Sequence, residues 1–361
     1  MKREKIMVGM SGGVDSSVAA LLLKQQGYEV AGMTLRLCPE DAGLTGDRSG
    51  CGAQQDIEDA AKVCAALDIP HYIMDFTDLF AQKVMRPFAE AYLQGQTPNP
   101  CVLCNPSIKF GAMLEQALSM GYDAVATGHY AKIIEENGRY HLYKAPVAKD
   151  QSYVLYTLTQ HQLAHIRFPL YGMEKDAARK LAEEYHLPVA HKPDSEEICF
   201  VKDNDYAGFI RRFTGKTSPA GSFVDERGKV LGRHKGIMHY TIGQRKGLGI
   251  AFGKPMYVIG IDAKTNRVTL GEEGTQYAQA LTADRVNWIS FETLTDAVEC
   301  EARIRYQAKP ATCTVFPLPD GAVRVVFEAP QRSVTPGQSV VFSRGNEILG
   351  GGIIRCSHRT L

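Results

Sequence analysis

Apolar and polar positions alternate in blocks over the first 130 residues. Short apolar runs rich in β-branched residues predict strands, and longer segments with apolar residues every three or four positions predict helices. The expected strands are Lys5–Val8, Glu29–Leu35, His71–Asp75 and Ala124–Thr127, and the expected helices are Ser16–Gln26, Gln54–Leu67, Leu79–Gln94 and Ile108–Met120. Because strands alternate with helices, we expect an α/β domain with a parallel sheet and helices on both faces.

The pattern changes along the second half of the chain. Two more helices are expected within residues 151–190, at Tyr153–Leu163 and Lys175–Tyr185. From about residue 206, short β-branched runs separated by Gly- and Pro-containing turns predict two small all-β domains, the last one barrel-like. The expected strands there are Gly221–Val224, Met256–Asp262, Arg267–Leu270, Cys313–Phe316, Val323–Phe327 and Ser339–Phe342. The predicted domains are therefore 1–205, 206–276 and 277–361.

A glycine-rich segment, Gly9–Ser16, links the first strand to the first helix. Glycines let backbone N–H groups approach an anion, and a helix that begins there directs the positive end of its dipole to the same place. The loop lacks the Lys-Ser/Thr ending of a Walker loop. It instead contains Asp15, whose carboxylate is suited to holding Mg²⁺ beside a phosphate. The loop predicts phosphate binding, although similar turns also occur without a ligand.

Other strand ends are expected at the same edge of the sheet. Met33-Thr34 and Thr127-Gly128-His129 follow or end predicted strands. Ligands of such sheets bind beyond the carboxyl ends of the strands. We therefore expect these pieces to converge on the glycine loop, with His129 either near a nucleotide or as a structural histidine.

Charge is distributed unevenly along the 361 residues. The chain carries a net charge of +1, with 22 Lys and Arg against 15 Asp and Glu in residues 201–361, and 19 against 25 in residues 1–200. Such asymmetry favours a polyanionic partner for the C-terminal half, although ordinary scatter in surface charge also produces it. The basic loop His239–Gly249 contains Tyr240 and suits phosphate contact and stacking, although an ordinary solvated hairpin has the same composition. No run of about 18 apolar residues and no signal-peptide pattern occur, so we expect a cytoplasmic protein without a membrane contact.

The cysteines suggest chemistry at two places. Thr97–Asn105 is a Pro-rich segment with Cys101 and Cys104 in a Cys-x-x-Cys pair, which we expect to be a loop, because proline disfavours helix and central strand. The pair alone fits half a zinc site, a redox pair or two structural thiols. Cys199 follows acidic residues that tend to raise a thiol pKa. The remaining cysteines are expected to be buried small hydrophobes (Cys64, Cys313) or exposed at a polar loop (Cys38, Cys51), with Cys300 and Cys356 less informative.

Together these segments resemble the tRNA-specific 2-thiouridylase family, and the similarity covers almost the whole chain. The matching segments are Gly9–Ser16, Asn99–Asn105, Lys149-Asp150-Gln151, Ile198-Cys199-Phe200, His239–Gly249, Arg303–Tyr306 and Thr335–Gln338. The glycine loop alone indicates only a broad ATP pyrophosphatase superfamily, whereas the combination is specific.

The resemblance implies ATP-dependent transfer of sulfur to C2 of the wobble uridine of certain tRNAs. Attack of the uridine O2 on the α-phosphate makes an adenylate, because hydroxide is a poor leaving group and AMP a good one. The implied nucleotide-binding residues are Gly9, Met10, Ser11, Gly12, Gly13, Val14, Asp15, Ser16, Met33 and Gly128, with Met33 on the adenine and Asp15 on Mg²⁺.

The resemblance also assigns the thiols. Cys199 carries a persulfide received from a sulfur-donor protein, a cysteine desulfurase or a relay protein. Cys104 is the nucleophile that leaves a Cys104–Cys199 disulfide, which a thiol must reopen. Many members of the family have Asp at the position of Cys101, so three thiols are present here. An iron–sulfur cluster held by Cys101, Cys104 and Cys199 is the minority alternative.

The implied tRNA contacts are Asn99, Pro100, Cys101, Lys149, Asp150, Gln151, Arg305 and Tyr306. The target base has to leave its stack to react, and tRNA affinity is expected to fall steeply with salt. Two other functions remain as alternatives: an ATP-dependent ligase or amidotransferase acting on a small metabolite, and a non-catalytic RNA-binding module. The first leaves two β domains and the paired thiols without a task, and the second leaves Asp15 without one.

Overall fold

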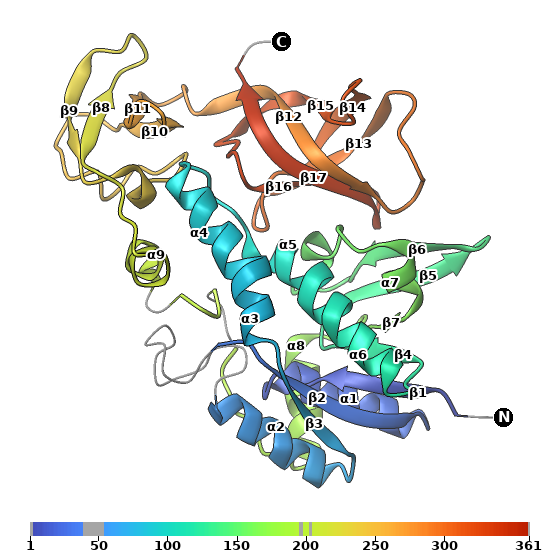
Figure 1. Ribbon diagram of the computed structural model, residues 1–361. Helices are drawn as coiled ribbons and strands as arrows, with labels where there is room; N and C mark the ends of the chain where they lie inside the picture. Colours follow the sequence, from blue (N-terminus) through green and yellow to red (C-terminus); the bar gives the residue numbers. More distant parts are fainter. Residues whose placement is uncertain (1–2, 39–53, 195–197, 202–203, 360–361) are drawn as a thin grey trace. The chain divides into compact units, whose positions relative to one another are not determined.

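The computed structural model describes residues 3–38, 54–194, 198–201 and 204–359. Cys51 lies outside the described residues, as do Glu196 and Glu197, two of the acidic residues that precede Cys199. The chain forms two compact units, the first made of residues 1–85, 101–204 and 346–348 and the second of residues 86–100, 205–345 and 349–361. Each unit is described by itself, and Figure 1 gives the element labels.

The first unit contains a five-stranded parallel sheet in the order β3-β2-β1-β4-β7. Its strands are β1 (Lys5–Gly9), β2 (Glu29–Arg36), β3 (His71–Asp75), β4 (Ala124–Ala126) and β7 (Ile166–Arg167). From β1 the chain continues to β2 and β3 on one side, whereas β4 and β7 lie on the other. The order therefore reverses between β1 and β4, where open α/β sheets bind ligands. The predicted α/β fold with a parallel sheet is confirmed.

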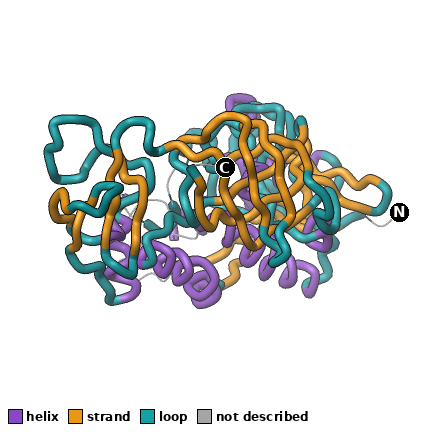
Figure 2. Tube along the Cα trace, turned by 90° about the horizontal axis from the view of Figure 1, so that it is seen from above, coloured by secondary structure: helices purple, strands orange, loops and turns teal. Residues whose placement is uncertain are grey.

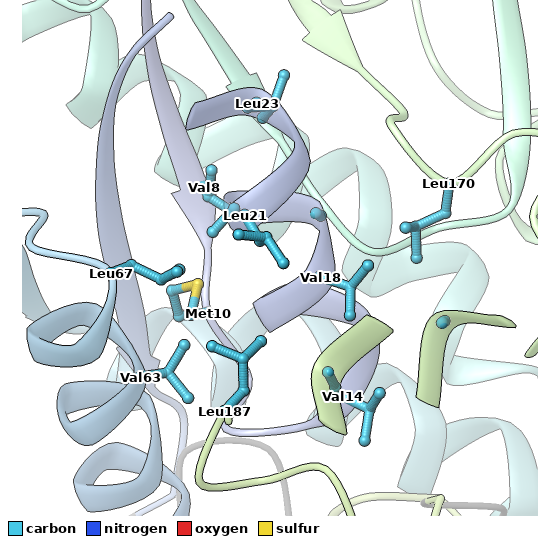
Figure 3. Close-up of a cluster of buried hydrophobic side chains, with 14 of the residues drawn as sticks. Val8, Met10, Val14, Val18, Leu21, Leu23, Val63, Leu67, Leu170 and Leu187 are labelled. Carbon is cyan, nitrogen blue, oxygen red and sulfur yellow. The ribbon is translucent and has the colours of Figure 1, made fainter. Parts of the chain in front are cut away.

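Helices of the first unit pack on this sheet and around it. They are α1 (Val14–Gln25), α2 (Gln54–Ala66), α3 (Thr77–Phe80), α5 (Pro100–Cys104), α6 (Met113–Ser119), α7 (Gln160–Ala164) and α8 (Lys175–Glu184), with π-helical turns at Ala81–Met85 and Asn105–Ala112 and a 3₁₀ turn at Ser152–Val154. Figure 3 shows the core beside α1, to which Val8 of β1, Val18 of α1, and Val63 and Leu67 from the region of α2 all contribute. Alternate strand residues such as Met7 are equally buried, as expected for a strand covered on both faces.

The first unit also contains a hairpin that the sequence patterns did not predict. Strands β5 (Ala131–Glu136) and β6 (Arg139–Lys144) pair in antiparallel fashion, and Glu347 and Ile348 extend the pairing at β6. His141 Nδ1 lies 2.7 Å from a carboxylate oxygen of Glu347. A sequence-distant segment of three residues thereby completes this unit.

Two sequence predictions in this unit were wrong. The Cys-x-x-Cys segment is not a loop, because Pro100 occupies the first position of α5, where its missing N–H costs no helical hydrogen bond. The expected helix Tyr153–Leu163 is interrupted, and α7 begins only at Gln160. Thr159 caps it in a capping box with Gln162, so the chain starts a new helix there.

The second unit contains helices α4 (Arg86–Leu93) and α9 (Tyr206–Thr214) and two β structures. Helix α9 contradicts the prediction that residues 206–276 are all β. Its sequence signals are present in Asp205, whose carboxylate accepts from Gly208 N at 2.8 Å, and in Gly215, which has a φ of +69°. Phe88 of α4 and Phe209 of α9 pack with ring centroids 6.0 Å apart.

The smaller β structure is a four-stranded sheet in the order β10-β11-β8-β9. Its strands are β8 (Gly221–Val224), β9 (Val230–His234), β10 (Tyr257–Asp262) and β11 (Arg267–Gly271), with a 3₁₀ turn at Ile237–His239. Tyr240 is buried in its core, where its ring packs on Phe223 and His234 at centroid distances of 5.2 and 5.6 Å. Tyr240 is therefore a core residue and not a stacking surface, whereas Arg245 and Lys246 of the same loop are exposed.

The larger β structure is a six-stranded barrel, seen as the densest group of orange strands in Figure 2. Its strands are β12 (Tyr277–Trp288), β13 (Val298–Arg303), β14 (Ala311–Pro317), β15 (Val323–Arg332), β16 (Ser339–Arg344) and β17 (Glu347–His358). Strand β12 pairs with both β15 and β17, which closes the barrel and leaves no strand edge. The predicted C-terminal β-barrel is confirmed. No helix in the described ranges has the length and apolar character needed to cross a bilayer.

Candidate functional site

The glycine loop joins the end of β1 to the start of α1, and both of its ends are fixed in the core. Met10 and Val14 are each only 3% exposed and point into the apolar cluster beside α1 (Figure 3). Within the loop, the hydroxyls of Ser16 and Ser17 donate to Gly13 O at 3.1 and 2.8 Å. The side chains of Met10 and Val14 are therefore occupied by packing, and only the backbone at these positions is available for a ligand.

Close approaches explain two glycines at this place. Gly12 has a φ of +66°, and a Cβ there would collide with the Asp56 carbonyl of α2. A Cβ on Gly128, just after β4, would lie 2.6 Å from the Asp15 carbonyl carbon. The loops after β1 and β4 thus meet at the position where the strand order reverses, as the sequence predicted. Met33 is fully buried in β2, and its carbonyl accepts from Met10 N at 2.8 Å.

Asp15 is surrounded by hydrogen-bond donors from distant parts of the chain. Its Oδ1 accepts from the Tyr130 hydroxyl at 2.8 Å and from Lys175 Nζ at 2.6 Å, and its Oδ2 accepts from Lys149 Nζ at 3.1 Å. A second carboxylate, Asp194, accepts from Lys149 at 2.5 Å, from Lys175 at 2.9 Å and from Arg179 at 3.0 Å. We call these six residues the loop ion cluster.

Titration of the loop ion cluster follows from these contacts. Burial tends to lower the pKa of Lys149, but its hydrogen bond to Asp194 and the charge of Asp15 prevail, so the pKa is raised. Burial tends to raise the pKa of Asp194, but the hydrogen bonds from Lys149 and Lys175 prevail and lower it. Burial and the adjacent Asp15 carboxylate raise the pKa of Tyr130. The lysine is therefore charged, the carboxylate ionised and the phenol neutral at pH 7.

The surroundings of Asp15 do not fit a magnesium site. Mg²⁺ requires oxygen ligands in octahedral geometry, and two ammonium groups within 3.1 Å of this carboxylate repel a dication. Within the described residues, no group of three potential metal ligands occurs. The positive charge at this loop is supplied by Lys149 and Lys175, and Asp15 is not a metal ligand.

Cys104 lies at the junction between α5 and a π-helical turn. Pro106 lacks the N–H that would bond to Val102 O in a regular helix, and the Thr157 hydroxyl donates to that carbonyl instead, at 3.4 Å. Gln162 Nε2 donates to Pro106 O and Phe110 O, both at 2.9 Å. Thr157 and Gln162 thus hydrogen-bond to carbonyls of α5 and of the π-helical turn. Such π-helical turns often occur at functional sites.

The three thiols of interest differ in exposure. Cys101 and Cys104 are three positions apart on α5; Cys101 is exposed, whereas Cys104 is buried at 9% exposure. Cys199 is half-buried. It is followed by Phe200, which packs edge-on against Phe80 at 5.6 Å. Because the described residues contain no cluster of three potential ligands, the iron–sulfur alternative has no ligand set in this structure.

The segment before α5 is anchored within the second unit. Thr97 N donates to Pro336 O at 3.1 Å, and Gln338 Nε2 donates to Thr97 O at 2.6 Å. Asn99 is half-buried and Pro100 buried. The Thr335–Gln338 turn, which the sequence marked only by resemblance, therefore fixes the backbone two residues before Asn99.

Comparison with known proteins assigns the chain. Residues 4–203 match the family model described as tRNA methyl transferase HUP domain, residues 207–272 the tRNA methyl transferase PRC-barrel domain, and residues 278–354 the aminomethyltransferase beta-barrel domain. A protein of Clostridium acetobutylicum named tRNA-specific 2-thiouridylase MnmA is 52% identical over 98% of this chain and 99% of its own length. The chain belongs to the tRNA-specific 2-thiouridylase family.

Further relatives in this family are similarly close. The protein of that name from Acetivibrio thermocellus is 52% identical over 98% of this chain and 100% of its own length. One from Caldanaerobacter subterraneus, named tRNA-specific 2-thiouridylase MnmA 2, is 51% identical over 98% of both chains. The full-length relatives therefore carry the 2-thiouridylase name, although two of the family models are described as methyl transferase domains.

The Lys149-Asp150-Gln151 segment lies against the glycine loop through the contact of Lys149 with Asp15. Lys149 belongs to the loop ion cluster. Asp150 accepts from Ala145 N and Ser152 N at 2.9 and 3.2 Å, and Gln151 Oε1 accepts from Tyr130 N at 3.1 Å. In this structure Asp150 and Gln151 stabilise the turn that presents Lys149.

Arg305 and Tyr306 lie in the turn after β13, and both are exposed, with Tyr306 at 40%.

His129 is 8% exposed, with its Nδ1 2.7 Å from the Thr127 hydroxyl oxygen and its ring beside Phe110 and Phe168. His129 is thus packed as a structural histidine. Cys38, which was expected to be exposed, is 7% exposed and buried.

Sequence reasoning missed Tyr130, Lys175 and Arg179 as members of the loop ion cluster. Tyr130 follows the Thr127-Gly128-His129 strand end, so its proximity to the loop had a signal in the sequence. Lys175 begins α8, far from every motif, and no local pattern distinguishes it from a surface lysine. Only the packing of α8 beside α1 places it there, through buried Ala178 and Ala182.

Proposed function

We propose that this chain is a tRNA-uridine 2-sulfurtransferase that adenylates O2 of the wobble uridine with ATP and then replaces it with sulfur. The observation that carries the proposal is near-complete similarity to proteins named tRNA-specific 2-thiouridylase. The first unit adds physical support, since it holds both a glycine loop at a strand-order reversal and a helix bearing Cys104.

ATP binds at the loop between β1 and α1, with phosphates on the backbone N–H groups and the dipole of α1. The proposed contact residues are Gly9, Met10, Ser11, Gly12, Gly13, Val14, Asp15, Ser16, Met33 and Gly128. Met10 and Val14 contribute backbone only, because their side chains are buried. The uridine O2 attacks the α-phosphorus, pyrophosphate leaves, and AMP becomes the leaving group at C2. Mg²⁺ accompanies ATP without a site at Asp15.

Sulfur transfer uses the two cysteines. The terminal sulfur of a Cys199 persulfide bonds to C2 as the C2–O bond breaks and AMP departs. The Cys104 thiolate then attacks the inner sulfur at Cys199, and the electron pair of the broken S–S bond stays on the sulfur at C2. The products are 2-thiouridine and a Cys104–Cys199 disulfide, which an external thiol reduces. A cysteine desulfurase or a relay protein is the proposed donor to Cys199.

tRNA is the proposed macromolecular substrate, and its body is bound by the basic C-terminal half. Arg305 and Tyr306 are proposed to contact the tRNA from their exposed turn. The other proposed tRNA contacts are Asn99, Pro100, Cys101, Lys149, Asp150 and Gln151. Arg305→Ala is expected to weaken tRNA binding and reduce the slope of log affinity against log salt by about one. The proposed domain bounds are 1–205, 206–276 and 277–361, and the three matched ranges support them. The proposed location of the protein is the cytoplasm.

One reconstitution tests the function. The protein is incubated with ATP, a persulfide donor and unmodified tRNA, and 2-thiouridine and pyrophosphate are measured together. Cys104→Ser and Cys199→Ser are expected to abolish thiolation but keep tRNA-dependent pyrophosphate release, whereas the control Cys356→Ser, in the barrel, keeps both. Absence of thiolation by the wild type, with pyrophosphate released on a small metabolite, would favour a ligase.

Cys101 separates the two sulfur-transfer mechanisms. In the persulfide mechanism, anaerobically prepared protein without iron is fully active and Cys101→Ala retains thiolation. An iron-containing, coloured protein that loses iron and activity in Cys101→Ala would instead support a cluster. Because Cys101 is exposed on α5 and Cys104 buried, we expect the first result.

A further inference from the structure

The glycine loop has no lysine of its own, and two distant lysines lie at it. Lys175 Nζ is 2.6 Å from Asp15 Oδ1, and Lys149 Nζ is 3.1 Å from Asp15 Oδ2. Asp15 is the second residue of α1, directly after the loop. Both ammonium groups therefore lie at the place where the loop backbone and the α1 dipole favour an anion.

Asp194 holds the two lysines from a second direction. Lys149 and Lys175 contact different oxygens of Asp194, at 2.5 and 2.9 Å. The two carboxylates and the two ammonium groups thus form a closed ring of four ion pairs. Each ammonium group has three N–H donors and uses two of them in this ring, which leaves one on each lysine for another acceptor.

The charges and exposure of the cluster also favour an anion. Lys149, Lys175 and Arg179 carry three positive charges against the two of Asp15 and Asp194, so one positive charge is in excess. The side chains of Lys149 and Lys175 are 28% and 18% exposed, so neither ammonium group is sealed in the core. A polyphosphate can therefore reach them without unfolding the cluster.

Local structure fixes both lysines in place. Lys175 is the first residue of α8, whose Ala178 and Ala182 are fully buried in the core shared with α1. Lys149 precedes Asp150, which closes a turn by accepting from Ala145 N and Ser152 N. The ammonium group of Lys149 also lies 5.7 Å from the centre of the Tyr130 ring. Two preorganised cations cost little further ordering when an anion binds.

We propose that Lys175, together with Lys149, pairs with the polyphosphate of ATP and takes the part that the lysine of a Walker loop plays within its own loop. Asp15 and Asp194 are positioning residues that hold the two ammonium groups. The inference rests on the proposed use of ATP, and it assigns Lys149 to the nucleotide before the tRNA.

The test measures equilibrium binding of ATP and AMP, with Mg²⁺ in constant excess, to wild type, Lys175→Gln, Lys175→Arg and Lys149→Gln. Lys180→Gln is the matched control, because Lys180 lies on the same helix with an exposed side chain. Each glutamine variant is expected to lose about 10- to 100-fold of ATP affinity, the usual size for a hydrogen bond between charged groups, and much less of AMP affinity. Lys175→Arg should recover most of the loss.

A second comparison separates phosphate contact from indirect effects. Removing Lys175 also uncovers the charge of Asp15, which by itself repels ATP. The double variant Asp15→Asn/Lys175→Gln is compared with Asp15→Asn alone, because this repulsion is absent from both. Weaker ATP binding by the double variant supports direct contact by Lys175, and equal affinity overturns it. Equal losses for ATP and AMP, or a loss of tRNA affinity alone, would also overturn the proposal. These outcomes are distinct from failure of the proposed function, which shows as absent thiolation by the wild type.

Discussion

Lys175 donates a hydrogen bond to Asp15 across 160 positions of sequence, with 2.6 Å between the two atoms. The contact joins the first residue of α8 to the start of α1. It brings a cation to a phosphate-type loop whose own sequence has none. The chemistry of this loop is therefore distributed over several segments of the first unit rather than contained in one motif.

Gly12→Ala is expected to destabilise the protein and impair ATP binding. The position requires a φ of +66°, and a Cβ would also collide with the Asp56 carbonyl, so the start of α2 or the loop must move. Gly27→Ala is the control, because Gly27 also has a positive φ, +88°, but no atom within 4 Å of its Cβ position. Both variants carry a backbone cost of about 1 kcal/mol. Thermal unfolding should show a clearly larger loss for Gly12→Ala, and equal losses would contradict the clash.

The sequence predicted this loop and its neighbours for a physical reason. Parallel strands end at one edge, so Gly9–Ser16 and Thr127-Gly128 had to converge once both strands were identified. Lys175 and Asp194 could not be predicted in this way, because their positions depend on how α8 packs and not on a local pattern. The helix α9 had its capping signals in Asp205 and Gly215, which outweigh the β-rich composition around them.

For the Cys-x-x-Cys segment, local sequence rules predicted the wrong structure. Prolines argued for a loop, yet Pro100 starts a helix and Pro106 is accommodated by a π-helical turn. The side chains of Thr157 and Gln162 stabilise this arrangement by donating hydrogen bonds to carbonyls of residues 102–110. A rule that considers only the local chain cannot include such tertiary partners.

Gln162→Leu is expected to slow sulfur transfer without removing adenylation. The substitution keeps similar volume but removes the donors to Pro106 O and Phe110 O, so the turn after Cys104 loses its support. It should cost about 1 to 3 kcal/mol of stability, since two part-buried carbonyls each lose a hydrogen bond. Single-turnover thiolation and pyrophosphate release measure the two steps separately. Gln94→Leu, at an exposed position after α4, is the control, and equal slowing of both steps would argue against a role specific to Cys104.

Gln338→Ala is expected to lower thiolation by several-fold. Gln338 holds the Thr97 carbonyl at 2.6 Å, and the Asn99-Pro100-Cys101 segment proposed to contact the tRNA follows directly. A single hydrogen bond of this kind contributes about 1 kcal/mol to stability. Gln331→Ala serves for comparison, because the Gln331 side chain donates to the nearby Ala329 carbonyl at the exposed end of β15. If the two variants thiolate tRNA at the same rate, the Thr97 anchor does not matter for the reaction.

Alkylation with iodoacetamide should sort the cysteines by exposure and pKa. Burial raises the pKa of Cys64 to about 11, and the hydrogen bond with Cys300 together with burial raises that of Cys313. The thiolate is the reactive form, so both should label at least about 100-fold more slowly than exposed Cys101 in the native protein. Mass spectrometry after timed quenching measures this order. In denaturant the difference should vanish, and fast native labelling of Cys313 would contradict its burial in the core of the barrel.

Acid is expected to destabilise the protein partly through His129. Burial lowers its pKa well below the usual value, with a further contribution from Lys109, so the folded state holds this ring neutral. The unfolded chain binds a proton there below about pH 6.5, so stability is present above that pH and falls as the pH decreases. One such group contributes a slope of up to about 1.4 kcal/mol per pH unit.

His129→Gln should reduce the slope of the unfolding free energy between pH 6.5 and 5, measured by denaturant titration, although it lowers stability at pH 7. His191→Gln, at a site with an 87% exposed side chain, is the control for removing a histidine at the surface. Because burial also lowers the pKa of His71, His234 and His239, part of the slope remains in His129→Gln. An unchanged slope in that variant would mean that the ring takes up a proton in the folded protein as readily as in the unfolded chain.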